Sequence, residues 1–346
     1  MAHEYYAVIL EFSAQKVALG FAGEPQFHVC VTPTSPLWKK FVYSDNEIRY
    51  PTFLGLGSHA LLAEDKDKLR LCLSEDEKST VSQYNKDYGT HWVCWKNDKF
   101  RALSRLVKHL ILALLLISNA SAKLFIIDGG MAAVEKALLC ESLFAQNASV
   151  AVTFLPRSPC LAISGGVENG TLVHFGWNEC CVVCVCDLRC VSSRSLLEYS
   201  GESIHYLMVK SMRMNQDGDF ALVSTEMSIE NETLQSLFSK DGLPARIAAE
   251  ILALDIDSRP LVALNILFSG ELALVLGLTE KIIEQVNHQL GTLQAQQTPC
   301  LGAWAGASLY CSVGLLRENP SKWKHKEITR EKLSGAGWKE LQYLNT

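Results

Sequence analysis

The segment 170–188 constrains the fold more than any other part of the chain. Two runs of β-branched and other apolar residues in it flank a short turn around Gly176, a pattern that predicts a buried β-hairpin. A second hairpin of this kind opens the chain, where the apolar runs 7–10 and 17–21 flank the polar connection 11–16. A repeated hairpin predicts a duplicated fold of two lobes. The residues at the hairpin tips then decide whether a phosphate can bind between the lobes.

Size and charge exclude several classes of function. A chain of 346 residues is long enough for two lobes with a core each. A formal net charge of −5 gives no field that attracts nucleic acid or an anionic membrane, and we interpret the locally basic segment 322–332 as a solvated surface. The longest apolar run, 110–117, is far shorter than the roughly 20 residues of a membrane helix. We therefore expect no nucleic-acid partner and no membrane span.

The cysteines point to a reducing compartment rather than to a metal site. The chain has 12 cysteines, and its first residues lack the basic and apolar regions of a signal peptide. We therefore expect reduced thiols in the cytosol or nucleus. In the densest cluster, Cys180, Cys184 and Cys186 are predicted to share one face of a strand, which is not the tight knuckle of a zinc site. We predict buried apolar cysteines and no bound metal.

Apolar periodicity predicts an α/β fold. Between the two hairpins, a helix is expected over 101–118, with Leu103, Leu106, Val107, Leu110, Ile111, Leu114 and Leu115 on its buried face. The elements expected beyond it are a strand at 123–127, a helix at 132–144 and a strand at 150–155. After the second hairpin we expect helices at 199–214 and 245–254, a strand at 264–268, a helix ending at 290 and a helix from 304. Alternating strands and helices indicate an α/β architecture.

Four segments, in this order, resemble motifs of actin and the actin-related proteins. They are Gly20-Phe21-Ala22-Gly23, Ser200-Gly201 with Tyr206-Leu207-Met208, Asp255-Ile256-Asp257-Ser258-Arg259 with Asn265 and Ser269-Gly270, and Trp304-Ala305-Gly306-Ala307-Ser308. The resemblance covers nearly the whole chain. It implies the duplicated actin/hexokinase-type ATPase fold, with two lobes that close on ATP and a divalent cation.

The resemblance also implies the domain boundaries, with both small subdomains shortened. The large subdomain of lobe I would comprise 1–34, 75–163 and 302–346, and its reduced small subdomain 35–74. The large subdomain of lobe II would comprise 164–199 and 239–301, and its reduced small subdomain 200–238.

The nucleotide cleft that the resemblance implies is degenerate. Its remaining candidate residues are Glu11 and Lys16 at the first hairpin, Gly176 at the second, and Ser269 and Gly270 near the adenine position. The family's phosphate loops use glycines so that backbone N–H groups can converge on phosphate, and most of those glycines are missing here. The loss of two or three charge-assisted hydrogen bonds, at about 1.5–3 kcal/mol each, weakens binding from micromolar to millimolar or worse.

Three further substitutions argue against hydrolysis. Trp177 stands where a phosphate would lie, Glu271 replaces a glycine beside the nucleotide, and Pro156 takes the place of a glutamine that orients the attacking water. The carboxylates that would hold hydrated Mg²⁺ are also mostly gone. We therefore expect no catalytic residues and no cofactor. A shifted Lys16 leaves residual binding of ATP or ADP open.

Within the family, the shortened subdomains and degenerate cleft are similar to the divergent actin-related subunit of dynactin's pointed-end complex. Three segments fit that subgroup: Phe154-Leu155-Pro156-Arg157, Cys186-Asp187-Leu188-Arg189 and Gly335-Ala336-Gly337-Trp338. This resemblance implies a cytoplasmic, cytoskeleton-associated protein that caps the pointed end of dynactin's actin-related filament and binds the other pointed-end subunits. The alternatives are a degenerate nuclear actin-related subunit of a chromatin-remodelling complex and, less favoured, an active ATP-binding actin-like protein.

Overall fold

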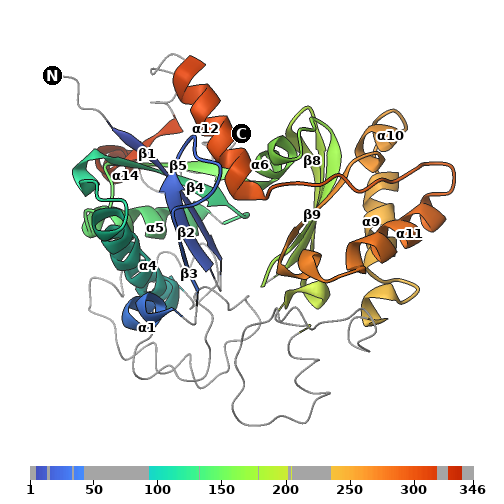
Figure 1. The fold of residues 1–346 in the computed structure, drawn as a ribbon, viewed down its shortest axis with the longest axis horizontal. Helices are drawn as coiled ribbons and strands as arrows, with labels where there is room; N and C mark the ends of the chain where they lie inside the picture. The colour runs from blue at the N-terminus through green and yellow to red at the C-terminus, as the bar shows by residue number, and fades with distance from the viewer. Residues whose placement is uncertain are drawn as a thin grey trace, which may run out of the picture. The chain divides into compact units, whose positions relative to one another are not determined.

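The computed structural model describes residues 5–13, 16–32, 35–42, 93–131, 133–177, 179–201, 204, 235–317 and 326–336. The chain divides into two compact units, the first formed by Met1–Pro156 and Cys311–Thr346 and the second by Arg157–Tyr310. Each unit contains helices and one mixed β-sheet, so the predicted α/β class is confirmed (Figure 1). Most of the predicted small subdomains, 35–74 and 200–238, lies outside the described residues.

The sheet of the first unit has six strands in the order β10-β5-β4-β1-β2-β3. Three consecutive strands form an antiparallel meander, β4 pairs parallel to β1, β5 pairs parallel to β4, and β10 pairs antiparallel to β5. The strand bounds are β1 (Tyr6–Ser13), β2 (Lys16–Phe21), β3 (Val29–Val31), β4 (Ala122–Asp128), β5 (Ala151–Pro156) and β10 (Ile328–Thr329).

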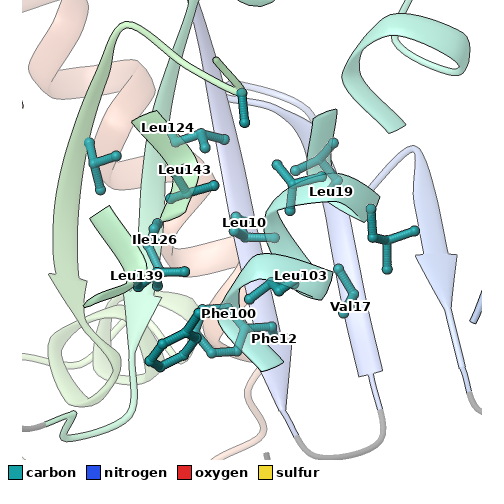
Figure 2. Packing of buried hydrophobic residues seen from close by; sticks show 14 of the residues in the cluster. Leu10, Phe12, Val17, Leu19, Phe100, Leu103, Leu124, Ile126, Leu139 and Leu143 are labelled. Carbon is teal, nitrogen blue, oxygen red and sulfur yellow. The ribbon is translucent and has the colours of Figure 1, made fainter. Parts of the chain in front are cut away.

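Two helices, α4 (Val93–Ala113) and α5 (Ala133–Ala145), cover one face of this sheet. Alternate residues of β1, Val8, Leu10 and Phe12, lie in the same buried cluster as Leu103 and Leu139 from the helices, as Figure 2 shows for most of them. Full burial of such a side chain stabilises the fold by about 1.5–3 kcal/mol. The same unit contains α1 (Pro36–Val42), the short 3₁₀ helix η1 (Asn119–Ser121) and α14 (Arg330–Ala336).

The apolar face of α4 is only partly as predicted. Leu103, Leu106 and the other predicted positions up to Ile111 are fully buried, but Leu114 is 44% exposed. The helix begins before the predicted start and ends at Ala113, because Leu116 adopts a left-handed φ of 55° that a helix cannot include. The prediction of a helix through 118 is therefore wrong at its end, although Leu115 is buried beyond the helix.

Residues 327–330 contact the rest of the first unit through side chains and strand pairing. Lys123 Nζ lies 2.6 Å from Glu327 Oε1, and the Arg330 guanidinium donates to Asn147 Oδ1 at 2.7 Å and to the Phe144 carbonyl. Ile328 is buried where β10 pairs with β5. The basic segment 322–332 is thus not simply a solvated surface over its described residues 326–332, because Glu327, Ile328 and Arg330 contact the rest of the first unit.

The sheet of the second unit has four strands in the order β8-β7-β6-β9. They are β6 (Gly170–Phe175), β7 (Cys180–Cys186), β8 (Arg189–Leu196) and β9 (Ile266–Gly270). The first three again form an antiparallel meander and the fourth again pairs parallel to the first. A parallel bridge between Ile266 and Gln297 continues the sheet beyond β9. The strand order and directions of the first unit, from β3 to β5, are therefore repeated in the second.

Both predicted hairpins are present, as β1-β2 and β6-β7. The helices of the second unit are α6 (Arg157–Ser164), α9 (Leu243–Leu252), α10 (Ser258–Ala263), α11 (Leu278–Leu290) and the first part of α12 (Ala303–Arg317), with 3₁₀ helices η2 (Leu197–Tyr199), η3 (Ser236–Phe238) and η4 (Glu271–Leu274). The predicted strand 264–268 lies two residues later, as β9. The predicted helix 199–214 lies mostly outside the described residues.

Helices α6 and α12 meet at a glycine. A Cβ atom built on Gly306 would lie 1.7 Å from the carbonyl oxygen of Cys160, which is far inside any real contact distance. Only a residue without a side chain therefore permits this approach between the two helices. Gly306 belongs to the carboxyl-terminal segment that resembles the actin motif.

Candidate functional site

The candidate residues of the first hairpin form an ion pair with each other. The predicted connection 11–16 is shorter in the structure, because β1 runs to Ser13 and β2 begins at Lys16. Glu11 consequently lies within β1, opposite Ala18 of β2. Lys16 Nζ lies 2.9 Å from Glu11 Oε2, and the two side chains are 31% and 17% exposed, respectively.

The surroundings of this pair fix the lysine further. Its ammonium group also lies over the ring of Phe27, 5.1 Å from the ring centroid, a distance at which a cation and an aromatic face attract each other. A phosphate at Lys16 would compete with the Glu11 carboxylate for the same ammonium group. The charge of Lys16, which left nucleotide binding open, is thus compensated within the hairpin.

At the second hairpin, the backbone of Gly176 bonds to other backbone groups. Its N–H donates to the Glu179 carbonyl at 2.9 Å, and its carbonyl accepts from the Gly201 N–H at 2.9 Å. A Cβ on Gly176 would lie 2.8 Å from the Glu179 oxygen, so a tight turn requires glycine here. The N–H group that a phosphate loop would turn toward its ligand is engaged within the turn.

Trp177 follows in the same turn and is buried, with 9% of its surface exposed. Its ring packs against Gly201, where a built Cβ would lie 3.3 Å from both the Trp177 Cα and a ring carbon. The indole therefore forms part of the packing between the hairpin and the segment after η2. Asn178, the next residue, lies outside the described residues.

Ser269 and Gly270 lie beside the second hairpin, at the end of β9. Phe175 is the register partner of Gly270 in the parallel pairing of β6 and β9. Gly270 has a φ of +91°, and a Cβ on it would lie 2.1 Å from the Phe175 carbonyl oxygen. Ser269 Oγ lies 2.9 Å from His174 Nδ1. Ser269 and His174 lie 95 residues apart in the sequence, and only the register of the parallel strands reveals their contact.

The structure therefore brings the five candidates together as two groups, each within one unit. Glu11 and Lys16 form the ion pair of the first hairpin, while Gly176, Ser269 and Gly270 gather around the end of β6. Of the substituted positions, Pro156 is the exposed last residue of β5 and Glu271 is the half-buried first residue of η4.

Two buried carboxylates were not singled out from the sequence. Asp128, at the end of β4, lies 2.6 Å from Lys136 Nζ, and both residues are less than 10% exposed. The same carboxylate accepts the N–H groups of Gly130 at 2.9 Å and Met131 at 2.8 Å. The sequence showed Asp128 only as the end of a strand. A lysine eight positions later, among the apolar residues of the following helix, is the signal that points to the pair.

The second buried carboxylate joins α9 to β8. Glu250 is 5% exposed, accepts from Ser192 Oγ at 2.6 Å and pairs with the Nε of Arg194. An acidic residue inside the apolar face of α9 carries little sequence signal, since its partners come from a strand more than 50 residues earlier. These contacts hold the sheet and the helix together and leave Glu250 fully engaged.

The clustered cysteines of β7 are protonated at neutral pH. Burial raises the pKa of Cys184 to about 11, although its contact with the Thr171 hydroxyl opposes the shift. Burial and the adjacent Glu179 raise the pKa of Cys181 to about 12. Cys180 and Cys184 are buried, as predicted, whereas Cys186, at the end of β7, is only half-buried.

Within the described ranges, no group of three or more His, Cys, Asp or Glu side chains is arranged to hold a metal ion. Over the same residues, every helix is too short or too polar to span a bilayer. A scan against models of known protein families found no match, and a search of curated proteins found no significant match either.

Proposed function

We propose that the chain is a non-catalytic, actin-related structural subunit of dynactin. In this role it caps the pointed end of the actin-related filament, links it to the other pointed-end subunits and supports dynein-driven transport along microtubules. It would be the counterpart of actin-related protein 10, also numbered 11. The proposal places it in the cytoplasm, associated with the cytoskeleton.

The observation that carries the proposal is the repeated strand order of the two units. An antiparallel three-stranded meander followed by a strand parallel to its first member occurs in both sheets. This repeat is what a duplicated fold of the actin type would produce. It supports the sequence resemblance, because the four actin-like segments and the repeat are independent observations.

The state of the candidate residues supports a structural role over catalysis. Lys16 is paired with Glu11, and the Gly176 N–H donates to the Glu179 carbonyl. Position 270 requires glycine because a Cβ there would overlap the backbone of its neighbouring strand. Each group that could have contacted a nucleotide thus has a role in holding its own unit together. A protein of actin type without ligand contacts would act through its surfaces.

A cap needs one filament-forming surface and must lack the other. Protomers of an open filament present two different surfaces, one to each neighbour. In actins the small subdomains at the pointed end contact the next protomer, and in this chain the segments 35–74 and 200–238 are short for that task. A protomer shortened in this way would join the filament at one end and stop its growth.

Affinity purification of the tagged full chain from cells tests the proposal. We expect dynactin filament and pointed-end subunits in the eluate, identified by mass spectrometry, with tagged conventional actin as the control bait. Subunits of a chromatin-remodelling complex in place of dynactin would contradict the proposal and favour the nuclear alternative. Recovery of neither complex from cells in which dynactin itself is recovered intact would also contradict it.

A further inference from the structure

Three of the four sheet edges in the described structure are short or covered. In the first unit, one edge is the two-residue strand β10, fastened by the Lys123–Glu327 ion pair, and the other is the three-residue strand β3. In the second unit, the outer side of β9 is taken by the segment around Gln297, whose neighbours exchange backbone hydrogen bonds with Ile266 at 2.8 and 2.9 Å. Such edges do not accept an added strand.

The fourth edge, β8, is different. It is eight residues long and is the terminal strand of its sheet (Figure 1). Six of its residues are exposed, and the part of the chain that the structure describes makes no backbone hydrogen bond to β8 beyond its pairing with β7. A long strand of this kind presents a row of unpaired N–H and C=O groups to a partner.

The inner side of β8 is held in a fixed register. Residues 192–196 pair regularly with 184–180 of β7, and the bulge at Val191 interrupts the pairing only before Ser192. The hydroxyl of Ser192 bonds to Glu250, and the hydroxyl of Ser195 bonds to Glu179. Five consecutive residues of the strand are therefore preorganised, which lowers the entropic cost of binding a partner strand.

The charges of β8 select the partner. The strand contains Arg189 and Arg194, and no acidic residue. Arg189 is exposed, and the side chain of Arg194 keeps 45% of its surface exposed although it pairs with Glu250. A second copy of the chain would bring another Arg189 to the edge, and this repulsion disfavours pairing of β8 with itself. A segment with carboxylates complements the strand.

We propose that the outer edge of β8 is a strand-addition site for an extended, acidic segment of a partner protein. The partner's backbone pairs with residues 192–196, and its carboxylates meet Arg189 and Arg194. Val191, 49% exposed, offers an apolar contact beside them. The inference does not rest on the proposed function, because it follows from the edges of one sheet.

The test measures binding of a labelled synthetic peptide of about eight residues, alternating glutamate with valine or threonine, to the full chain. We expect saturable binding and slower amide hydrogen exchange within 189–196. A peptide of the same sequence that is N-methylated at alternate positions cannot pair as a strand. The Arg189→Glu variant reverses one charge at the edge, and Arg105→Glu on α4 makes the same charge change in the first unit.

The proposal predicts that N-methylation abolishes binding, that Arg189→Glu weakens it by about tenfold or more, and that Arg105→Glu leaves it unchanged. Equal binding of the N-methylated peptide, or equal binding of a peptide with lysine in place of glutamate, would overturn it. So would unchanged hydrogen exchange within 189–196 at saturation. Protection of 189–196 that grows with protein concentration in the absence of peptide would instead identify a second copy as the occupant and overturn the choice of partner.

Discussion

The sheet of the second unit leaves no room for a side chain at Gly270. Its φ of +91° lies in the region that side-chain-bearing residues rarely adopt, and the Phe175 carbonyl oxygen occupies the space a Cβ would need. Gly176 is similarly confined by the Glu179 oxygen. Two residues that the actin resemblance assigns to a nucleotide cleft are therefore required for packing, whether or not a nucleotide binds.

Gly270→Ala is expected to destabilise the second unit more than a glycine substitution without a clash. Gly277 also has a positive φ, +77°, but a Cβ there meets nothing within 4 Å. Gly277→Ala should cost only the strain of that conformation, about 1–3 kcal/mol, whereas Gly270→Ala adds the overlap with Phe175. Urea denaturation of the two variants measures the difference. Equal losses in the free energy of unfolding for the two variants would show that the Phe175 carbonyl moves aside at little cost.

Asp128→Asn is expected to lower the free energy of unfolding by about 3–5 kcal/mol, because it leaves the buried ammonium of Lys136 without a counter-charge. The second substitution Lys136→Met in the same chain should restore most of the loss. Glu11→Gln breaks a more exposed pair and should cost about 1 kcal/mol or less. Chemical denaturation of the variants tests this order. A loss for Asp128→Asn no larger than that for Glu11→Gln would contradict a dry, tightly coupled pair.

At the scale of elements, the spacing of apolar residues predicted the strands and helices. It missed the contacts between residues that lie far apart in the sequence. The hairpins, β4, α5 and β9 follow from apolar runs bounded by Gly, Asp or Pro, and all are found within a few residues of the predicted positions. The helix end at Ala113 and the half-burial of Cys186 were missed, because apolar spacing does not show the left-handed Leu116 or where the end of a strand meets solvent. Pairs such as Ser269 with His174 need the sheet register.

Gly306→Ala is expected to force α6 and α12 apart. The added methyl group would overlap the Cys160 carbonyl, a rigid backbone atom, so the helices must separate at a cost of about 1–3 kcal/mol. Leu309→Ala removes a 52% exposed side chain from the same helix and should change stability by less than about 0.5 kcal/mol. Denaturation midpoints, with hydrogen exchange of the α6 amides, measure the effect. Unchanged exchange in α6 would contradict a close contact.

At the scale of the whole molecule, the described residues form two α/β units that share a strand order, and the candidate ligand groups are engaged inside each unit. The proposed dynactin role comes from the sequence resemblance, and the repeated sheets and the engaged residues are compatible with it.

The central claim of the proposed function is that this chain functions without a nucleotide. The most direct test is to purify the full chain under gentle conditions, extract it with acid and count ATP and ADP per polypeptide by chromatography, with conventional actin as the positive control. The account predicts a small fraction of a nucleotide per chain, unchanged by added Mg²⁺ and ATP. One nucleotide per chain would contradict it.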